Sequence, residues 1–230
     1  MAQLVLALDV PERDKALSLV RDLADIVPWC KVGLELFILA GPALLRELKA
    51  LGCKIFLDLK FYDTPHTVGQ AARAAAAVGV DLLTLHCQGG ERMCKTAREA
   101  FAGMAARPLL FGVTALTSFA HGEMPGIDAA PSDFALFLAK RAIGWGLDGV
   151  VCSGLEVGPV KESCPDLLCL CPGIRPAGAA AGDQRRVVTP GEAVRNGADF
   201  LVVGRPIVQA ASPRTATRLI LREMERYGFQ

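Results

Sequence analysis

The stretch Gly79-Val80-Asp81-Leu82-Leu83-Thr84-Leu85-His86 contains the unit from which the whole chain is built. A helix-like segment precedes it, a glycine and an aspartate form the joint, and a short apolar run follows. The same joint returns as Gly146-Leu147-Asp148 and Gly197-Ala198-Asp199, with Gly52-Cys53-Lys54 as a looser copy. Glycine fits the left-handed position that often follows the last turn of a helix. The repeat therefore predicts helices that each pass directly into a strand.

Eight short apolar runs are the predicted strands, and polar residues mark the end of each. They are Leu4–Val10, Trp29–Leu34, Lys54–Lys60, Leu82–Cys87, Leu109–Leu116, Gly149–Gly154, Leu167–Ile174 and Phe200–Ile207. Most of them lack alternation, as expected for parallel strands that are covered on both faces. Helix-like segments lie between them, for example Glu12–Ile26, Pro42–Leu51, Thr67–Val78, Arg92–Ala105, Ser132–Trp145 and Pro213–Tyr227.

This alternation of strands and helices predicts an α/β fold, the closed (β/α)8 TIM barrel. The alternative is an open doubly wound sheet, which usually carries a glycine-rich turn after its first strand. Here that turn is Asp9-Val10-Pro11-Glu12 and has no glycine, so the barrel is favoured. No linker or change of composition interrupts residues 1–230, and we expect a single domain.

Composition and charge narrow the classes of protein to which the chain can belong. Of its 230 residues, 52% are hydrophobic and 21% are charged, and the formal net charge is +1. This composition excludes a disordered chain, and the balanced charge excludes a strongly basic nucleic-acid-binding surface. No segment approaches the roughly 20 apolar residues of a membrane span. We therefore expect neither a nucleic-acid partner nor a membrane partner.

The location expected from the sequence is the cytoplasm. The apolar run at the start of the chain ends at Asp9 and is shorter than the core of a secretory signal. The eight cysteines include no Cys-x-x-Cys pair, so we expect them to be reduced packing residues. Closely spaced metal ligands are lacking as well, since the chain has only three histidines. The sequence thus predicts no metal site.

Polar residues at the carboxyl ends of the strands are the candidate site, because TIM barrels carry their active sites there. In the run Phe56–Lys60, Asp58 and Lys60 lie two positions apart, so both side chains face the barrel mouth. Lys31 on the neighbouring strand and Asp63 beyond the turn would complete an alternating array of lysines and aspartates. Burying charges is costly unless they pair. The array is therefore either catalytic or a structural ion-pair network that pins the barrel.

The chemistry of such an array suits the replacement of a carboxylate by hydrogen without a cofactor. A protein carboxylate beside an anionic substrate stresses it, and the stress relaxes as the negative charge leaves. A neighbouring ammonium stabilises the carbanion and then delivers a proton.

The loops after the last two strands predict a phosphate site, which is common at this place in TIM barrels. They supply Gly173, Gly204 and Arg205, and glycine lets backbone N–H groups approach an anion. The alternative is that Arg205 caps a helix or forms a surface ion pair. The glycine- and alanine-rich loop 175–186 is either a lid that closes on phosphate through Gln184 or Arg185, or a passive loop.

The sequence resembles the orotidine 5'-monophosphate decarboxylase family at these residues. The stretch Asp58–Val68 looks like the family signature DxKxxDxPxTV. Further matches follow in the family's order along nearly the whole chain, at Ala7–Val10, Lys31–Gly33, Leu116–Ser118, Pro172–Arg175, Gly182–Gln184 and Val203–Ile207.

The resemblance implies a role for each matched residue. Lys60 would donate the proton to C6 and Asp58 would lie beside the substrate carboxylate, while Lys31 and Asp9 would hold the ribose. Asp63 and Thr64 would reach into the neighbouring subunit's site, which implies a homodimer. Ser118 would read the pyrimidine edge, and Gln184 and Arg205 would hold the phosphate. The other substrate-binding positions implied are Thr67, Thr117, Pro172, Arg175 and Gly204, with no metal or cofactor.

Two other functions remain open from the sequence. Metal-dependent sugar-phosphate decarboxylases and aldolases of the same superfamily share the D-x-K-x-x-D strand, but they place an acidic metal ligand where Lys31 stands. A cation there would repel Mg²⁺. The other alternative is a non-catalytic nucleotide-binding barrel, against which the intact array of buried charges argues.

Overall fold

The computed structural model describes residues 2–177 and 186–228 of the chain. Its strands are β1 (Gln3–Ala7), β2 (Trp29–Val32), β3 (Lys54–Phe61), β4 (Leu82–His86), β5 (Leu109–Val113), β6 (Gly149–Val151), β7 (Leu168–Cys171) and β8 (Phe200–Val203). They pair in parallel in sequence order, and β8 closes onto β1. The predicted TIM barrel is confirmed, and each of the eight predicted strands is present.

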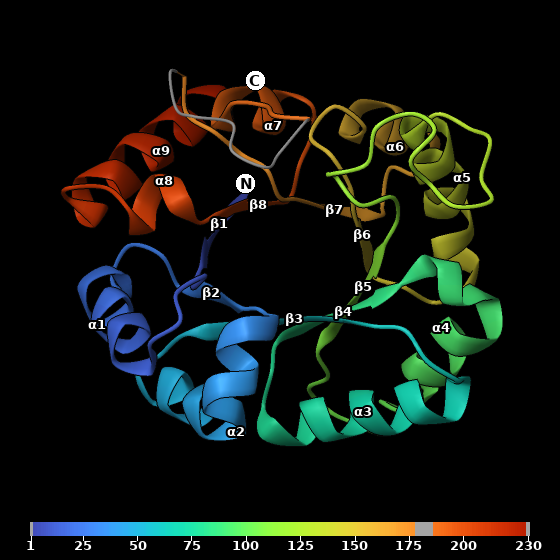
Figure 1. Ribbon diagram of the computed structural model, residues 1–230, viewed down its shortest axis with the longest axis horizontal. Helices are drawn as coiled ribbons and strands as arrows, with labels where there is room; N and C mark the ends of the chain where they lie inside the picture. Colours follow the sequence, from blue (N-terminus) through green and yellow to red (C-terminus); the bar gives the residue numbers. More distant parts are fainter. Residues whose placement is uncertain (1, 178–185, 229–230) are drawn as a thin grey trace.

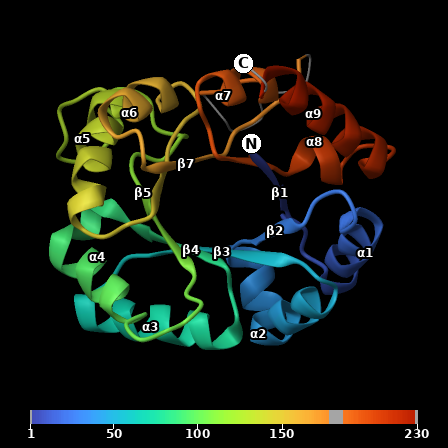
Figure 2. The ribbon, with the colours of Figure 1, turned by 180° about the vertical axis from the view of Figure 1, so that it is seen from behind.

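The helices lie outside the ring of strands in both views of the molecule (Figures 1 and 2). They are α1 (Arg13–Leu23), α2 (Leu34–Ala50), α3 (Pro65–Val78), α4 (Gly90–Glu99), α5 (Pro131–Gly144), α6 (Val157–Ser163), α7 (Pro190–Arg195), α8 (Arg205–Val208) and α9 (Pro213–Tyr227), with a 3₁₀ turn η1 at Cys87–Gly89. None in the described ranges is long and apolar enough to cross a membrane.

Helix α2 starts earlier than expected and two further helices were not expected, in each case for an identifiable reason. Helix α2 begins at Leu34 rather than Pro42, because Gly41 takes a φ of 58° and lets the chain continue across a kink. Helices α6 and α7 have only seven and six residues, too few to show a helical repeat in the sequence. Neither was therefore predicted.

Side chains alternate between two apolar cores, one inside the barrel and one between its wall and the helices. On β1, Val5 and Ala7 face the interior, whereas Leu4 and Leu6 face the helices. The interior is closed by aromatic rings from several strands; Trp29 meets Phe200 edge-on with ring centroids 5.4 Å apart. The polar mouth of the barrel lies directly above this filled apolar interior. The eight cysteines, all free thiols, are buried, as expected for packing residues.

The glycine–aspartate joints lie at the opposite end of the barrel from the mouth. Gly79, Gly146 and Gly197 take φ values of 88°, 77° and 93°, which confirms the left-handed ends predicted for these helices. The aspartate two residues later accepts a backbone N–H of the neighbouring strand: Asp81 from Ile55, Asp148 from Leu110 and Asp199 from Cys169, at 2.7 to 2.8 Å. Each of these carboxylates also pairs with a cation, Lys49, Arg107 or Lys161. Each joint therefore fixes one strand to the next.

Replacing Asp148 with alanine is expected to lower the free energy of unfolding by about 1–3 kcal/mol, because the buried N–H of Leu110 and the Arg107 guanidinium lose their shared acceptor. Urea unfolding of the purified proteins measures the change. The matched control is Asp166→Ala at an exposed position, which should stay within about 0.5 kcal/mol of the unmodified protein. Equal stability of the two variants would show that the joints do not fix the strands.

Candidate active site

The alternation along the strands decides which polar residues reach the mouth. Several residues of the barrel interior are followed, two positions later on the same face, by a polar residue or a glycine. These pairs are Ala7 and Asp9, Trp29 and Lys31, Phe56 and Asp58, Leu82 and Thr84, and Val202 and Gly204. Because all strands are parallel, the second members meet at one end of the barrel.

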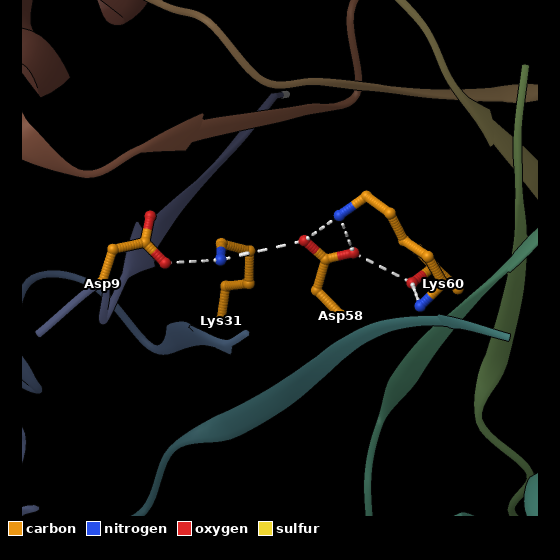
Figure 3. Close-up of polar contacts among 5 residues, drawn as sticks. Asp9, Lys31, Asp58 and Lys60 are labelled. Atoms are coloured by element: carbon orange, nitrogen blue, oxygen red, sulfur yellow. Dashed lines mark hydrogen bonds and ion pairs between the residues drawn. The ribbon is translucent and has the colours of Figure 1, made fainter. Parts of the chain in front are cut away.

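Four charged side chains form a continuous row across this mouth (Figure 3). The Nζ atom of Lys31 lies 2.8 Å from Asp9 Oδ1 and 3.8 Å from Asp58 Oδ2. The Nζ atom of Lys60 lies 2.8 Å and 2.9 Å from the two oxygens of Asp58. The charges alternate along the row, so each ammonium has a carboxylate beside it, and Asp58 lies between both ammoniums.

Asp58 is the most buried carboxylate of the row, and its pKa reflects a balance of opposing effects. Burial by itself raises the pKa of Asp58, since it penalises the charged form. The ammoniums of Lys60 and Lys31, with hydrogen bonds from Lys60 and Thr84, outweigh burial and leave the pKa below its ordinary value. Asp58 is therefore a fixed negative charge at neutral pH.

Thr84 is a site residue that the sequence did not single out. It is fully buried on β4, and its hydroxyl lies 2.9 Å from Asp58 Oδ1 and 3.1 Å from the backbone nitrogen of Lys60. A signal was present, because Thr84 is the one polar side chain inside the run Leu82–Leu85 and lies on its inward face.

The structure corrects the expected position of Asp63. Its side chain is exposed and does not join the row; its carboxylate instead accepts the backbone N–H of Thr64 at 2.5 Å. The fourth member of the row is Asp9, on the other side of Lys31. Asp63 follows the end of β3, where the chain already turns away toward α3, so spacing along the strand does not carry it into the mouth. Thr64, the cap of α3, and Thr67 are exposed too.

Gly33 lets the row come together. A Cβ atom at this position would lie 2.9 Å from Lys31 Nζ and 3.5 Å from Asp9 Oδ1. Any larger side chain would displace one of these charges from the other.

A cavity of about 440 Å³ opens beside the row and reaches the loops after β7 and β8. Among its lining residues are eight of those expected from the sequence: Asp9, Lys31, Asp58, Pro172, Gly173, Arg175, Gly204 and Arg205. Gln209, which directly follows α8, also lines the cavity and was not singled out from the sequence, because it does not lie at the end of a strand. The cavity thus joins the charged row to the predicted phosphate side.

Among the described residues, Lys60 and the other remaining predicted ones are not part of the lining of this cavity. Thr117 is buried and Ser118 is exposed, both beyond the end of β5. Gln184 and Arg185 lie outside the described residues.

Arg186, at the end of the glycine- and alanine-rich loop 175–186, forms a buried ion pair. Its guanidinium pairs with Glu156, which is only 3% exposed, and donates to the carbonyl of Leu116 at 3.1 Å. Glu156 also accepts the backbone N–H of Ser153 at 2.8 Å. Burial raises the pKa of Glu156 although Arg186 and Ser153 favour its charged form. Arg186 therefore links the segments that follow β5, β6 and β7.

His86 ends β4 close to the charged row. Burial lowers its pKa below the ordinary value, and the nearby Lys60 ammonium lowers it further against an opposing effect of Asp58. Its ring lies 5.6 Å from that of Tyr62. His86 is thus a neutral neighbour of the row at pH 7.

Comparison with known proteins agrees with this geometry. The sequence model of the "Orotidine 5'-phosphate decarboxylase / HUMPS family" matches residues 2–220. Proteins named orotidine 5'-phosphate decarboxylase from Nitratidesulfovibrio vulgaris (strain DP4) and Maridesulfovibrio salexigens are 51% and 48% identical to the chain. The alignments cover 97% of this chain in both cases, and 98% and 99% of those proteins.

Solved structures give the same result. The crystal structure of orotidine 5'-phosphate decarboxylase from Lactobacillus acidophilus superimposes with a TM-score of 0.82 at 35% identity, covering 97% of this chain and 99% of that one. The corresponding protein from Pyrococcus horikoshii OT3 gives a TM-score of 0.79 at 27% identity over 97% and 99% of the two chains.

The chain belongs to the orotidine 5'-phosphate decarboxylase / HUMPS family. Within the part of the chain that the structure describes, no three His, Cys, Asp or Glu side chains come together as ligands for a metal ion.

The lowered pKa of Asp58 predicts a pH-dependent contribution to stability. The unfolded chain holds the Asp58 proton more tightly than the folded one, so the contribution is complete above about pH 4 and is lost as the pH falls through the folded pKa. Asp58→Asn is therefore expected to be less stable than the unmodified protein by about 1–3 kcal/mol at pH 7. The difference should narrow below about pH 4. Urea unfolding across this range tests it; Asp166→Asn serves as control, and a gap that widens in acid would contradict the assignment.

Proposed function

We propose that the protein decarboxylates orotidine 5'-monophosphate to uridine 5'-monophosphate, the last step of de novo pyrimidine nucleotide synthesis, in a single domain spanning residues 1–230. One observation carries the proposal: a buried carboxylate, Asp58, lies between two ammoniums on the wall of a cavity that continues to Arg205. The names of the relatives at about 50% identity support the same activity.

The row supplies what cofactor-free decarboxylation requires. The substrate carboxylate would lie beside Asp58, whose fixed negative charge disfavours the bound ground state more than the transition state. The bond between C6 and the carboxylate carbon breaks, CO₂ leaves, and the electron pair stays on C6. The Lys60 ammonium stabilises this carbanion and then transfers its proton to C6.

The other residues would hold the parts of the substrate that do not react. Lys31 and Asp9 would bind the ribose hydroxyls, and Thr117 and Ser118 the pyrimidine edge. The phosphate would lie by Arg205 and Gly204, near Pro172, Arg175 and Gln184. A guanidinium and backbone N–H groups suit a dianion. Binding energy from this remote group can be used to press the carboxylate toward Asp58.

The metal-dependent chemistry of the superfamily is less favoured by the structure. The Lys31 ammonium lies between Asp9 and Asp58, where its positive charge offsets part of theirs and would repel a divalent cation. We therefore propose no cofactor and no metal.

We also propose that two copies of the chain share their active sites, with Asp63 and Thr64 of each reaching the other's cavity. Both residues are exposed, and the Asp63 carboxylate accepts the backbone N–H of Thr64 instead of joining the row. Exposed apolar side chains flank the mouth, among them Leu34 and Ile38 at the start of α2 and Tyr62 after β3. A second copy would cover them. With its free thiols, the dimer is expected in the cytoplasm.

The activity is tested with purified protein and orotidine 5'-monophosphate, by following the loss of substrate absorbance in excess EDTA. We expect full conversion to uridine 5'-monophosphate, because the proton donor and the charge that stresses the substrate both belong to the protein. Lys60→Ala should remove nearly all activity and keep the circular dichroism of the fold. A strict requirement for Mg²⁺ would refute the proposal in favour of the metal-dependent chemistry.

The shared site is tested by mixing two inactive variants, Lys60→Ala and Asp63→Ala, and allowing the subunits to exchange. In the hybrid dimer one site carries both defects and the other carries neither. Activity should return to about a quarter of the unmodified level at equal amounts and random exchange, because half of the dimers are hybrids with one intact site. Subunit exchange is verified with differently tagged chains. No recovery after verified exchange would place Asp63 in its own subunit's site.

A further inference from the structure

The backbone of Lys60 is unusual in a way that requires an explanation. Its φ is 51°, and no other residue but glycine takes a positive φ among those described. A side chain with a Cβ disfavours this left-handed conformation. The register of β3 against β4 also shifts between Leu57 and Phe61. The shift breaks the regular strand at the point where the ammonium leaves it, so other contacts must hold Lys60 there.

The hydroxyl of Thr84 makes that contact and makes a second one with Asp58. The backbone N–H of Lys60 donates to Thr84 Oγ1 at 3.1 Å, and Thr84 Oγ1 lies 2.9 Å from Asp58 Oδ1. The N–H group only donates and the carboxylate only accepts. The single hydroxyl proton must therefore point to Asp58, while an oxygen lone pair receives the Lys60 N–H. One oxygen atom thus fixes the carboxylate and the backbone of the ammonium that pairs with it.

The surroundings of Thr84 keep this arrangement rigid. The residue is fully buried and its β-branched side chain has few rotamers. No solvent is at hand to replace a lost hydrogen bond, and a buried hydroxyl costs free energy unless it is bonded. A threonine in the otherwise apolar run Leu82–Leu85 is therefore an arrangement that only the row beside it explains.

We propose that Thr84 is the positioning residue of the charged row, setting the Asp58 carboxylate and the left-handed Lys60 backbone in one fixed relation. Thr84 is fully buried and its hydroxyl is bonded to Asp58 and to the Lys60 backbone, so it acts through these two residues rather than on the substrate. The inference rests on the proposed function, in which Asp58 stresses the substrate carboxylate and Lys60 delivers the proton. A displacement of either by about 1 Å is enough to cost on the order of a hundredfold in rate.

Two substitutions at one position test the proposal. Thr84→Val keeps the shape and removes the hydroxyl, whereas Thr84→Ser keeps the hydroxyl. We expect Thr84→Val to lower kcat by about 10- to 100-fold with KM nearly unchanged, since the ribose and phosphate contacts are untouched. Thr84→Ser should restore most of kcat. Should the valine variant fail to fold, Thr84→Ala gives the same comparison with serine.

Thr114 provides a matched control on the neighbouring segment. It is also a buried threonine, 1% exposed, and its hydroxyl donates to the carbonyl of Val151 at 2.8 Å, away from the row. Thr114→Val should lower the melting temperature as Thr84→Val does but leave kcat unchanged. This separates positioning from a general loss of stability.

The outcomes are distinguishable. A kcat of Thr84→Val equal to that of the unmodified protein, or an equal loss in Thr84→Ser or Thr114→Val, would overturn the role of Thr84 and leave the proposed function intact. Absence of decarboxylation by the unmodified protein would instead overturn the function. The Thr84 proposal would then be judged from a crystal structure of Thr84→Val, where Lys60 should lose its left-handed φ; retention of that φ would refute it.

Discussion

A buried carboxylate stays charged at neutral pH when cations lie against it, and the barrel of this protein places two lysines beside Asp58. Asp58 is largely buried, and burial by itself would raise the pKa of its carboxyl group. Lys60 at 2.8 Å and Lys31 at 3.8 Å reverse that effect. Each comes from a fixed strand position, and β1 adds Asp9 to complete the row. A closed barrel brings these strands side by side at one level, which an isolated hairpin or helix would not do.

The two ends of the barrel use charge for different purposes. At one end, the aspartates of the helix–strand joints accept backbone N–H groups and pair with single cations. Their charges stabilise the contacts between neighbouring strands. At the other end Asp9, Lys31 and Asp58 of the row line an open cavity, where a ligand can reach them. The buried tie between Arg186 and Glu156 lies at the same end and connects three loops around that cavity. The joints at the closed end serve stability alone, whereas the charges at the mouth can also meet a ligand.

The site shows where inference from the sequence succeeds and where it fails. Period-two spacing placed Asp58 and Lys60 on one face, and the structure pairs them. The expectation that Asp63 would complete the row from beyond the turn was wrong, because the chain already turns toward α3 after β3 and the side chain is exposed. Thr84 was overlooked, since a single threonine in an apolar run has no charge to draw attention to it. Gln209 was not singled out because it follows the short helix α8 and not the end of a strand.

The sequence by itself determined the barrel, its eight strands and the residues at their carboxyl ends. Apolar runs, left-handed glycines and alternation along a strand are local properties, set by sterics and by the need to bury apolar surface. Only the tertiary structure decided which of those residues meet. The order Asp9, Lys31, Asp58, Lys60, the hydroxyl of Thr84 between Asp58 and the Lys60 backbone, and the space that Gly33 leaves for the row all depend on contacts between strands. The pleat and register of the closed sheet set those distances, which cannot be read from the sequence of any one strand.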